Sequence, residues 1–163
     1  MTANKATTAL VVLAVFTAVL TAGLGLVHSA SMPAAAQGTV QQYTMADVDN
    51  ALAKGPVFIE FETKECSYCK QQRPISEALA NDYSGKVTFF YIDAAENRAL
   101  ARQFQVSGVP QMNILLKKTD SGYTYVDRDG KSSDSIAASR FQGLTDRDTL
   151  RTSLDAAVQM RGL

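Results

Sequence analysis

The sequence predicts a three-layer α/β fold in which a mixed central sheet is flanked by helices. Compact apolar runs, typical of buried strands, alternate with segments whose apolar residues recur at helical spacing. A strand–helix–strand order implies parallel pairing, and a late strand–turn–strand unit implies antiparallel edge strands. The length of 163 residues, of which 46% are hydrophobic and 20% charged, suits one such domain preceded by a tail.

The tail is the N-terminal segment, residues 1–37, which has the features of an export signal. It has one basic residue, Lys5, then an uncharged, mostly apolar stretch at 6–27, and then small residues. That stretch is also long enough to cross a bilayer, so the segment is expected to be a signal peptide or a membrane anchor. Either alternative places the rest of the chain outside the cytoplasm, with a linker at 38–43 and the folded domain at 44–163.

The first half of the domain is predicted to run helix, strand, helix, strand. Thr44 is a plausible helix N-cap, with Asp47 three residues later. The predicted elements are a helix within 43–55, a strand at 57–61, a helix from Cys66 to about Asp82 that Pro74 interrupts, and a buried strand at 86–94.

The second half is predicted to add antiparallel strands and a closing helix. A hairpin is expected around Ser121 and Gly122, followed by a loop, and Thr145 or Asp146 is expected to cap the last helix. The predicted elements are a helix within 95–106, a strand at 111–118, the hairpin and loop at 119–139, a short strand at 140–143 and an amphipathic helix at 144–160.

The chain has two cysteines, Cys66 and Cys69, at the start of the helix that follows the first strand. Free backbone N–H groups and the helix dipole favour a thiolate at this position. We therefore expect Cys66 to attack a partner's disulfide and Cys69 to resolve the mixed disulfide that forms. A purely structural disulfide is a poor explanation, because a bridge that closes so short a loop stabilises the fold little.

Composition argues against other functions for the pair. A zinc site within one domain lacks ligands, because the one histidine, His28, lies in the N-terminal segment. A cysteine–histidine hydrolase lacks its base for the same reason. With 16 basic and 16 acidic residues, the charge balance gives no reason to expect nucleic acid as a partner. Metal delivery between two molecules, each offering both cysteines, stays open.

Two further features fit thiol–disulfide exchange. Glu60 interrupts the apolar strand before the cysteines; burial would raise its pKa and allow it to relay protons to Cys69. Val109 and Pro110 precede a later strand, where a cis peptide bond in a tight turn is expected. Such a turn, lying against the cysteines, would present the Val109 backbone to an extended substrate peptide.

Together these residues resemble the thioredoxin superfamily, over roughly 43–160. The resemblance rests on "VFIEF", "CSYCKQQRP", "VTFFYIDA", "VSGVP" and the closing "FQGLTDRDTLRTSLDAAV". It implies redox roles for Cys66 and Cys69 joined as a disulfide, a proton-transfer role for Glu60, and a cis-proline loop at Val109 and Pro110 that faces the pair.

The sequence also departs from typical thioredoxins. Glu65 stands where a tryptophan usually precedes the first cysteine, and Ser67 and Tyr68 replace glycine and proline between the cysteines. A tyrosine before the second cysteine resembles glutaredoxins and bacterial disulfide isomerases, and Val109 resembles disulfide-forming oxidases. Ser67 and Tyr68 are accordingly predicted to contact the substrate.

The resulting hypothesis is an extracytoplasmic thiol–disulfide oxidoreductase, acting as a reductase on protein thiols and disulfides. It needs no bound cofactor, since the dithiol itself carries the two electrons, and an exported reductase would be recycled by a membrane redox partner. The alternatives are a disulfide-forming oxidase or isomerase of the same fold, and a non-catalytic binding or assembly module with the same cysteines.

Overall fold

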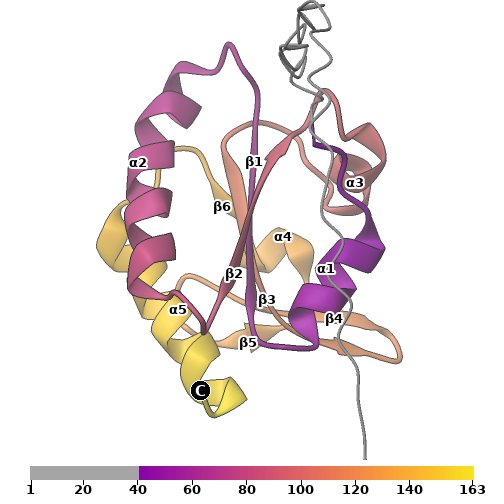
Figure 1. Ribbon diagram of the computed structural model, residues 1–163, viewed down its shortest axis with the longest axis vertical. Coiled ribbons are helices and arrows are strands. Elements are labelled where there is room, and N and C mark those ends of the chain that lie inside the picture. Colours follow the sequence, from indigo (N-terminus) through magenta and orange to yellow (C-terminus); the bar gives the residue numbers. More distant parts are fainter. Residues whose placement is uncertain (1–40) are drawn as a thin grey trace, which may run out of the picture. The chain divides into compact units, whose positions relative to one another are not determined.

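A computed structural model describes residues 41–163 of the chain (Figure 1). The predicted signal or anchor at 1–37, including 6–27, and the first residues of the linker at 38–43 lie outside the described residues. The last linker residues lead directly into the first helix, and the Tyr43 backbone N–H donates to Asn97 Oδ1 at 2.8 Å.

The centre of the domain is a mixed sheet, as the sequence predicted. Its strands run in the spatial order β2-β1-β3-β4-β5, and β6 pairs with the start of β3. Strand β1 pairs in parallel with β2 and antiparallel with β3. The strands are β1 (Val57–Glu62), β2 (Thr88–Asp93), β3 (Gln111–Thr119), β4 (Gly122–Val126), β5 (Ser132–Ser133) and β6 (Phe141–Gln142).

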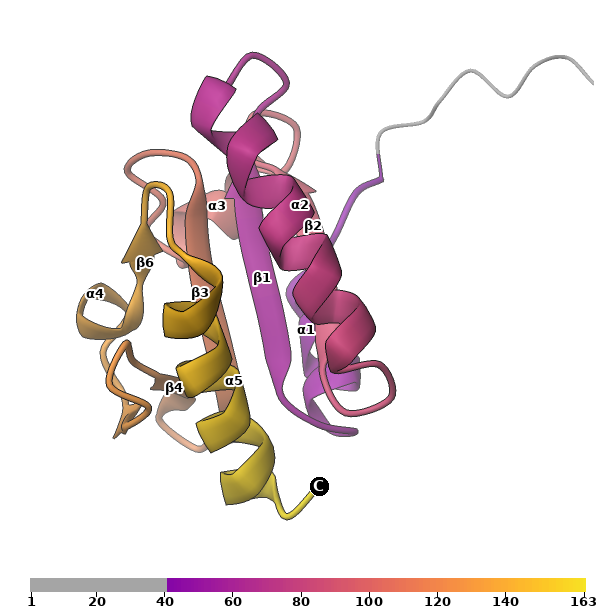
Figure 2. The ribbon, with the colours of Figure 1, turned by 90° about the vertical axis from the view of Figure 1, so that its left-hand side faces the viewer.

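Helices cover both faces of this sheet and confirm the three layers. Figures 1 and 2 show α2 and α5 on one face, with α1 and α3 on the other. The predicted caps are present: Thr44 and Asp47 form a capping box, and Asp146 accepts from Thr149 N–H at 2.9 Å. The helices are α1 (Met45–Leu52), α2 (Ser67–Asp82), α3 (Arg98–Gln103), α4 (Ile136–Ser139) and α5 (Arg147–Arg161).

Two hydrophobic cores, one on each face, hold β1 in place. Alternate residues of a strand point to opposite faces, and in β1 both sets are buried. Phe58 packs in the core beneath α2 and α5, whereas Ile59 and Phe61 pack in the core beneath α1 and α3. Because β1 packs against a hydrophobic core on each face, its C-terminal end is fixed in position. The segment that carries the cysteines starts from this end.

The structure corrects three details of the predicted elements. Strand β2 was expected to be buried, but it lies at the sheet edge and only Ile92 in it is fully buried. Helix α2 continues through Pro74, although the proline was expected to interrupt it. The segment expected to be a loop after the hairpin forms β5, which pairs with β4, and the one-turn helix α4. Within residues 41–163, no helix is both long enough and apolar enough to span a bilayer.

Gly55 gives a test of the packing between α1 and β1. A Cβ atom at Gly55 would lie 2.6 Å from the Lys86 carbonyl oxygen, a backbone atom that cannot move aside easily. We expect Gly55→Ala to lower the free energy of unfolding by about 1–3 kcal/mol, the usual cost of overpacking. Urea denaturation of the oxidised protein measures this. A variant as stable as the wild type would contradict the tight packing at this turn.

Candidate active site

The two cysteines lie at the N-terminus of α2 and form a disulfide. Cys66 is the N-cap residue, and the Cys69 backbone N–H donates to Cys66 Sγ at 3.0 Å. Cys66 is partly exposed, whereas Cys69 is 2% exposed. A backbone donor and the positive end of a 16-residue helix therefore converge on the outer sulfur, which favours the thiolate in the reduced protein.

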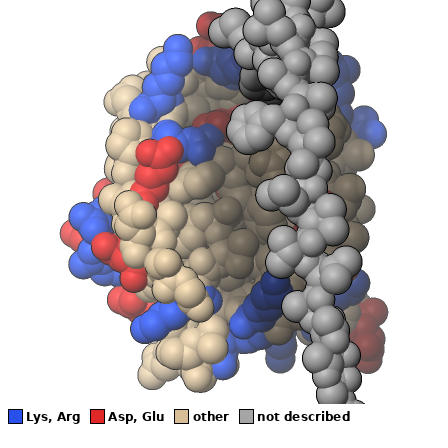
Figure 3. Space-filling model, in the orientation of Figure 1, with Lys and Arg blue, Asp and Glu red and all other residues tan. Residues whose placement is uncertain are grey.

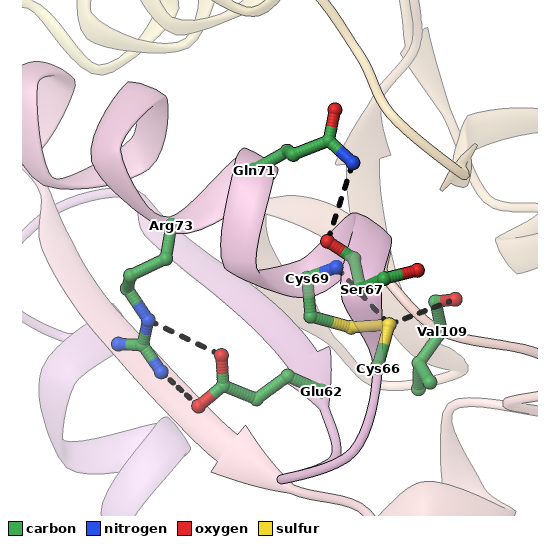
Figure 4. Close-up of a disulfide and its surroundings, with 7 residues drawn as sticks. All are labelled: Glu62, Cys66, Ser67, Cys69, Gln71, Arg73 and Val109. Carbon is green, nitrogen blue, oxygen red and sulfur yellow. Dashed lines mark hydrogen bonds and ion pairs between the residues drawn. A yellow bond between two sulfur atoms is a disulfide. The ribbon is translucent and has the colours of Figure 1, made fainter.

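The loop before β3 faces this disulfide. Its Val109–Pro110 peptide bond is cis, as the sequence predicted. Cys66 Sγ lies 3.6 Å from the Val109 carbonyl oxygen, which Figure 4 shows beside the disulfide. Pro110 is buried and Val109 is partly exposed. The arrangement leaves backbone of this loop next to the outer sulfur, where an extended peptide could pair with it.

Ser67 and Tyr68, between the cysteines, both face solvent. The Tyr68 side chain is 59% exposed, a large apolar surface for a residue beside a redox centre. Contact of these two residues with a substrate stays a prediction, because no second chain is present.

Glu60 lies on the face of β1 that α2 covers, and its side chain is completely buried. Burial raises the pKa of Glu60 to about 7, against the lowering influence of the nearby Ser76 hydroxyl and, after it, of the Arg73 guanidinium. Neither carboxylate oxygen has a hydrogen-bond partner among the described residues. Near neutral pH the group is therefore divided between its two protonation states, which suits a group that exchanges protons. No hydrogen bond joins it to Cys69, so its proton-transfer role stays a prediction.

Arg73, one helical turn beyond Cys69, forms the principal ion pair near the site. Its guanidinium contacts both carboxylate oxygens of Glu62, as Figure 4 shows, with Nε at 3.2 Å from Oε2. The same guanidinium lies over the Tyr91 ring, 3.8 Å from the ring centroid. In Figure 3, basic and acidic side chains intermix along the edge of the domain where α2 lies, without a patch of one sign.

Sequence reasoning missed a second loop beside the cysteines, the one between β6 and α5. Gly143 N–H donates to the Pro110 carbonyl at 2.9 Å, and Thr145 N–H donates to the buried Gln72 Oε1 at 2.8 Å. These bonds hold Leu144, which is 48% exposed, at the rim of the cis-proline loop. The signal for this loop in the sequence is a single apolar residue, Leu144, just before the polar cap of the last helix.

Within the described part of the chain, no group of three or more histidine, cysteine, aspartate or glutamate residues is placed to hold a metal ion.

The chain is similar in sequence to known proteins. The thioredoxin family model matches residues 39–151. The thioredoxin of Staphylococcus aureus is 32% identical over 76 residues, which cover 47% of this chain and 73% of that protein.

Solved structures add support for the fold. Chloroplastic thioredoxin z aligns with a TM-score of 0.52 at 17% identity, covering 76% of this chain and 96% of its own. The thioredoxin of Fasciola hepatica aligns with a TM-score of 0.50 at 22% identity, covering 69% of this chain and 90% of its own.

Proposed function

Because this chain belongs to the thioredoxin family, whose members are disulfide oxidoreductases, we propose that it reduces disulfides of protein substrates outside the cytoplasm. The observation that carries the proposal is the Cys66–Cys69 disulfide at the start of α2, with its outer sulfur against the Val109 carbonyl.

In the proposed reaction, the Cys66 thiolate attacks one sulfur of a substrate disulfide. That disulfide bond breaks, and the second substrate sulfur leaves as a thiolate. Cys69 then gives up its proton, which Glu60 accepts, and the Cys69 sulfur attacks Cys66 in the mixed disulfide. The first substrate sulfur leaves, so two electrons have passed from the protein to the substrate and the Cys66–Cys69 disulfide has formed.

The direction and location are proposed from the chain's organisation. Bacterial disulfide-forming oxidases of this fold carry a helical insertion between the cysteines and the cis-proline. In this chain the residues between α2 and Pro110 form β2 and α3 and no such insertion. The apolar segment at 6–27 supports export. A reductase in an oxidising compartment needs an electron donor, and a membrane redox partner is proposed for that step.

Insulin reduction tests this function. We expect the protein to precipitate insulin well above the dithiothreitol background, and a Cys66→Ser/Cys69→Ser double variant to match that background. Equilibration with glutathione then fixes the direction, since about 30 mV corresponds to about 1.4 kcal/mol for a two-electron couple. A couple more oxidising than glutathione would contradict the reductase role. Retention of an alkaline phosphatase fusion in the cytoplasm would contradict export.

A further inference from the structure

A buried cluster beneath the first turns of α2 surrounds the proton acceptor of the proposed exchange. At its centre is the Glu60 carboxylate, whose two oxygens lack hydrogen-bond partners in residues 41–163. Tyr91, which is in register with Glu60 on the neighbouring strand, has a buried hydroxyl that likewise lacks a partner. An ionised carboxylate in such surroundings is costly unless a positive charge lies near it.

A cation from α2 acts on this carboxylate. The charged groups that face Glu60 are Arg73 and Glu77 from α2 and Glu62 from β1. Strand β2 contributes the neutral Tyr91, and strand β3 contributes the apolar Met112. Two negative charges thus oppose ionisation of Glu60, and the Ser76 hydroxyl and the positive charge of Arg73 favour it.

The position of Arg73 is restrained on two sides. Glu62 binds the guanidinium through both oxygens, and the Tyr91 ring stacks against its plane. Arginine suits this arrangement because its planar fork can pair and stack at once, which a lysine ammonium cannot do. With its side chain 25% exposed, the guanidinium is partly removed from water, so its charge acts strongly on its neighbours.

Arg73 also borders the inner cysteine. A cavity of about 320 Å³ lies beside the start of α2 and has both Cys69 and Arg73 in its wall. The remaining lining residues are Glu62, Thr63, Lys64, Lys70 and Pro74. The cation that acts on Glu60 therefore also lines the same cavity as Cys69.

We propose that Arg73 is a positioning residue for thiol–disulfide exchange: fixed by Glu62 and Tyr91, it supplies the charge that lets the buried Glu60 carboxylate ionise and take the Cys69 proton. The inference rests on the proposed function. It states that the Arg73–Glu62 ion pair sets the pH range in which Cys69 can resolve the mixed disulfide.

The sign of each effect follows from the charges. In Arg73→Gln, the charged groups left near Glu60 are Glu62 and Glu77, both negative, so the pKa of Glu60 should rise. In Glu62→Gln, one opposing charge is lost, while the amide oxygen can still accept from the Arg73 guanidinium and the Tyr91 ring still lies beneath it, so Arg73 stays in place and the pKa of Glu60 should fall. Damage to the fold alone would not produce shifts in opposite directions.

The test is a carboxyl carbon NMR titration of Glu60 in the oxidised protein, for wild type, both variants and Lys70→Gln. Lys70→Gln is the matched control, because it removes a charge from the same helix and cavity wall without touching Glu62 or Tyr91. We expect the opposite shifts in the two variants and an unchanged midpoint in the control. Equal midpoints in all four proteins would overturn the proposal.

A kinetic measurement completes the test. Release of a bound substrate thiol from the Cys66 mixed disulfide, followed across pH by stopped flow, should shift its midpoint in Arg73→Gln in the same direction as the Glu60 titration. A shifted titration with an unshifted rate profile would overturn the positioning role, even with exchange intact. Wild-type protein that forms no mixed disulfide would instead contradict the proposed function, while the titration still reports on Arg73.

Discussion

Replacing Cys69 by serine is expected to turn the protein into a covalent trap that holds its substrates through Cys66. The outer sulfur keeps its surroundings in this variant: the N-cap position of α2, the donor N–H of residue 69 and the Val109 carbonyl. It should still attack a substrate disulfide. The buried second sulfur, however, is replaced by a hydroxyl that cannot displace the substrate thiol, so the mixed disulfide should persist.

Acid quenching followed by non-reducing electrophoresis measures this outcome. We expect the Cys69→Ser protein to form high-mass bands that disappear on reduction, and insulin turnover to fall to background. Cys66→Ser is the matched control: it keeps the inner cysteine, which is 2% exposed, and should form no such bands. A binding or assembly module would retain its partners in both variants without any covalent band, and that result would contradict the exchange chemistry.

Much of the fold was predictable because local and tertiary preferences agree along most of the chain. The run at 57–61 is apolar on both faces, and β1 is indeed buried on both. The caps at Thr44 and Asp146 mark helix starts that the structure confirms. The strand at 86–94 is as apolar in sequence as β1, yet β2 lies at an edge of the sheet. An apolar pattern alone does not predict how many strands will pair with a given strand.

The candidate site also contains residues that were predictable from the sequence and residues that were not. The closeness of the two cysteines, the burial of Glu60 and the cis peptide bond before Pro110 follow from short local patterns, and the structure shows all three. The roles assigned to these residues stay predictions. The pairing of Arg73 with Glu62 and Tyr91 was not found, because it depends on the register of β2 against β1 and on which way one turn of α2 faces. Register is a property of the assembled sheet, and residues far apart in the chain meet only through it.

Buried Glu60 should also make the stability of the oxidised protein depend on pH in an unusual direction. Its pKa is about 7 in the folded protein, raised by burial from an ordinary value of 4.5. Between these values the folded state binds the proton more tightly than the unfolded state, so stability falls as pH rises. The shift corresponds to about 3 kcal/mol of unfolding free energy, present below the lower value and lost above the upper one.

Comparison with Glu60→Gln isolates this effect. Other carboxyls act in the opposite direction: hydrogen bonds from Thr149 lower the pKa of Asp146, for example, so its contribution is lost as pH falls. These contributions cancel when the variant is subtracted from the wild type. Urea denaturation at several pH values measures the effect. The free energy of unfolding of Glu60→Gln, relative to that of the wild type, should increase by about 3 kcal/mol from acid to alkaline conditions. If the difference in unfolding free energy does not change with pH, Glu60 has the same pKa in the folded and unfolded states. That result would contradict its role as the proton acceptor for Cys69.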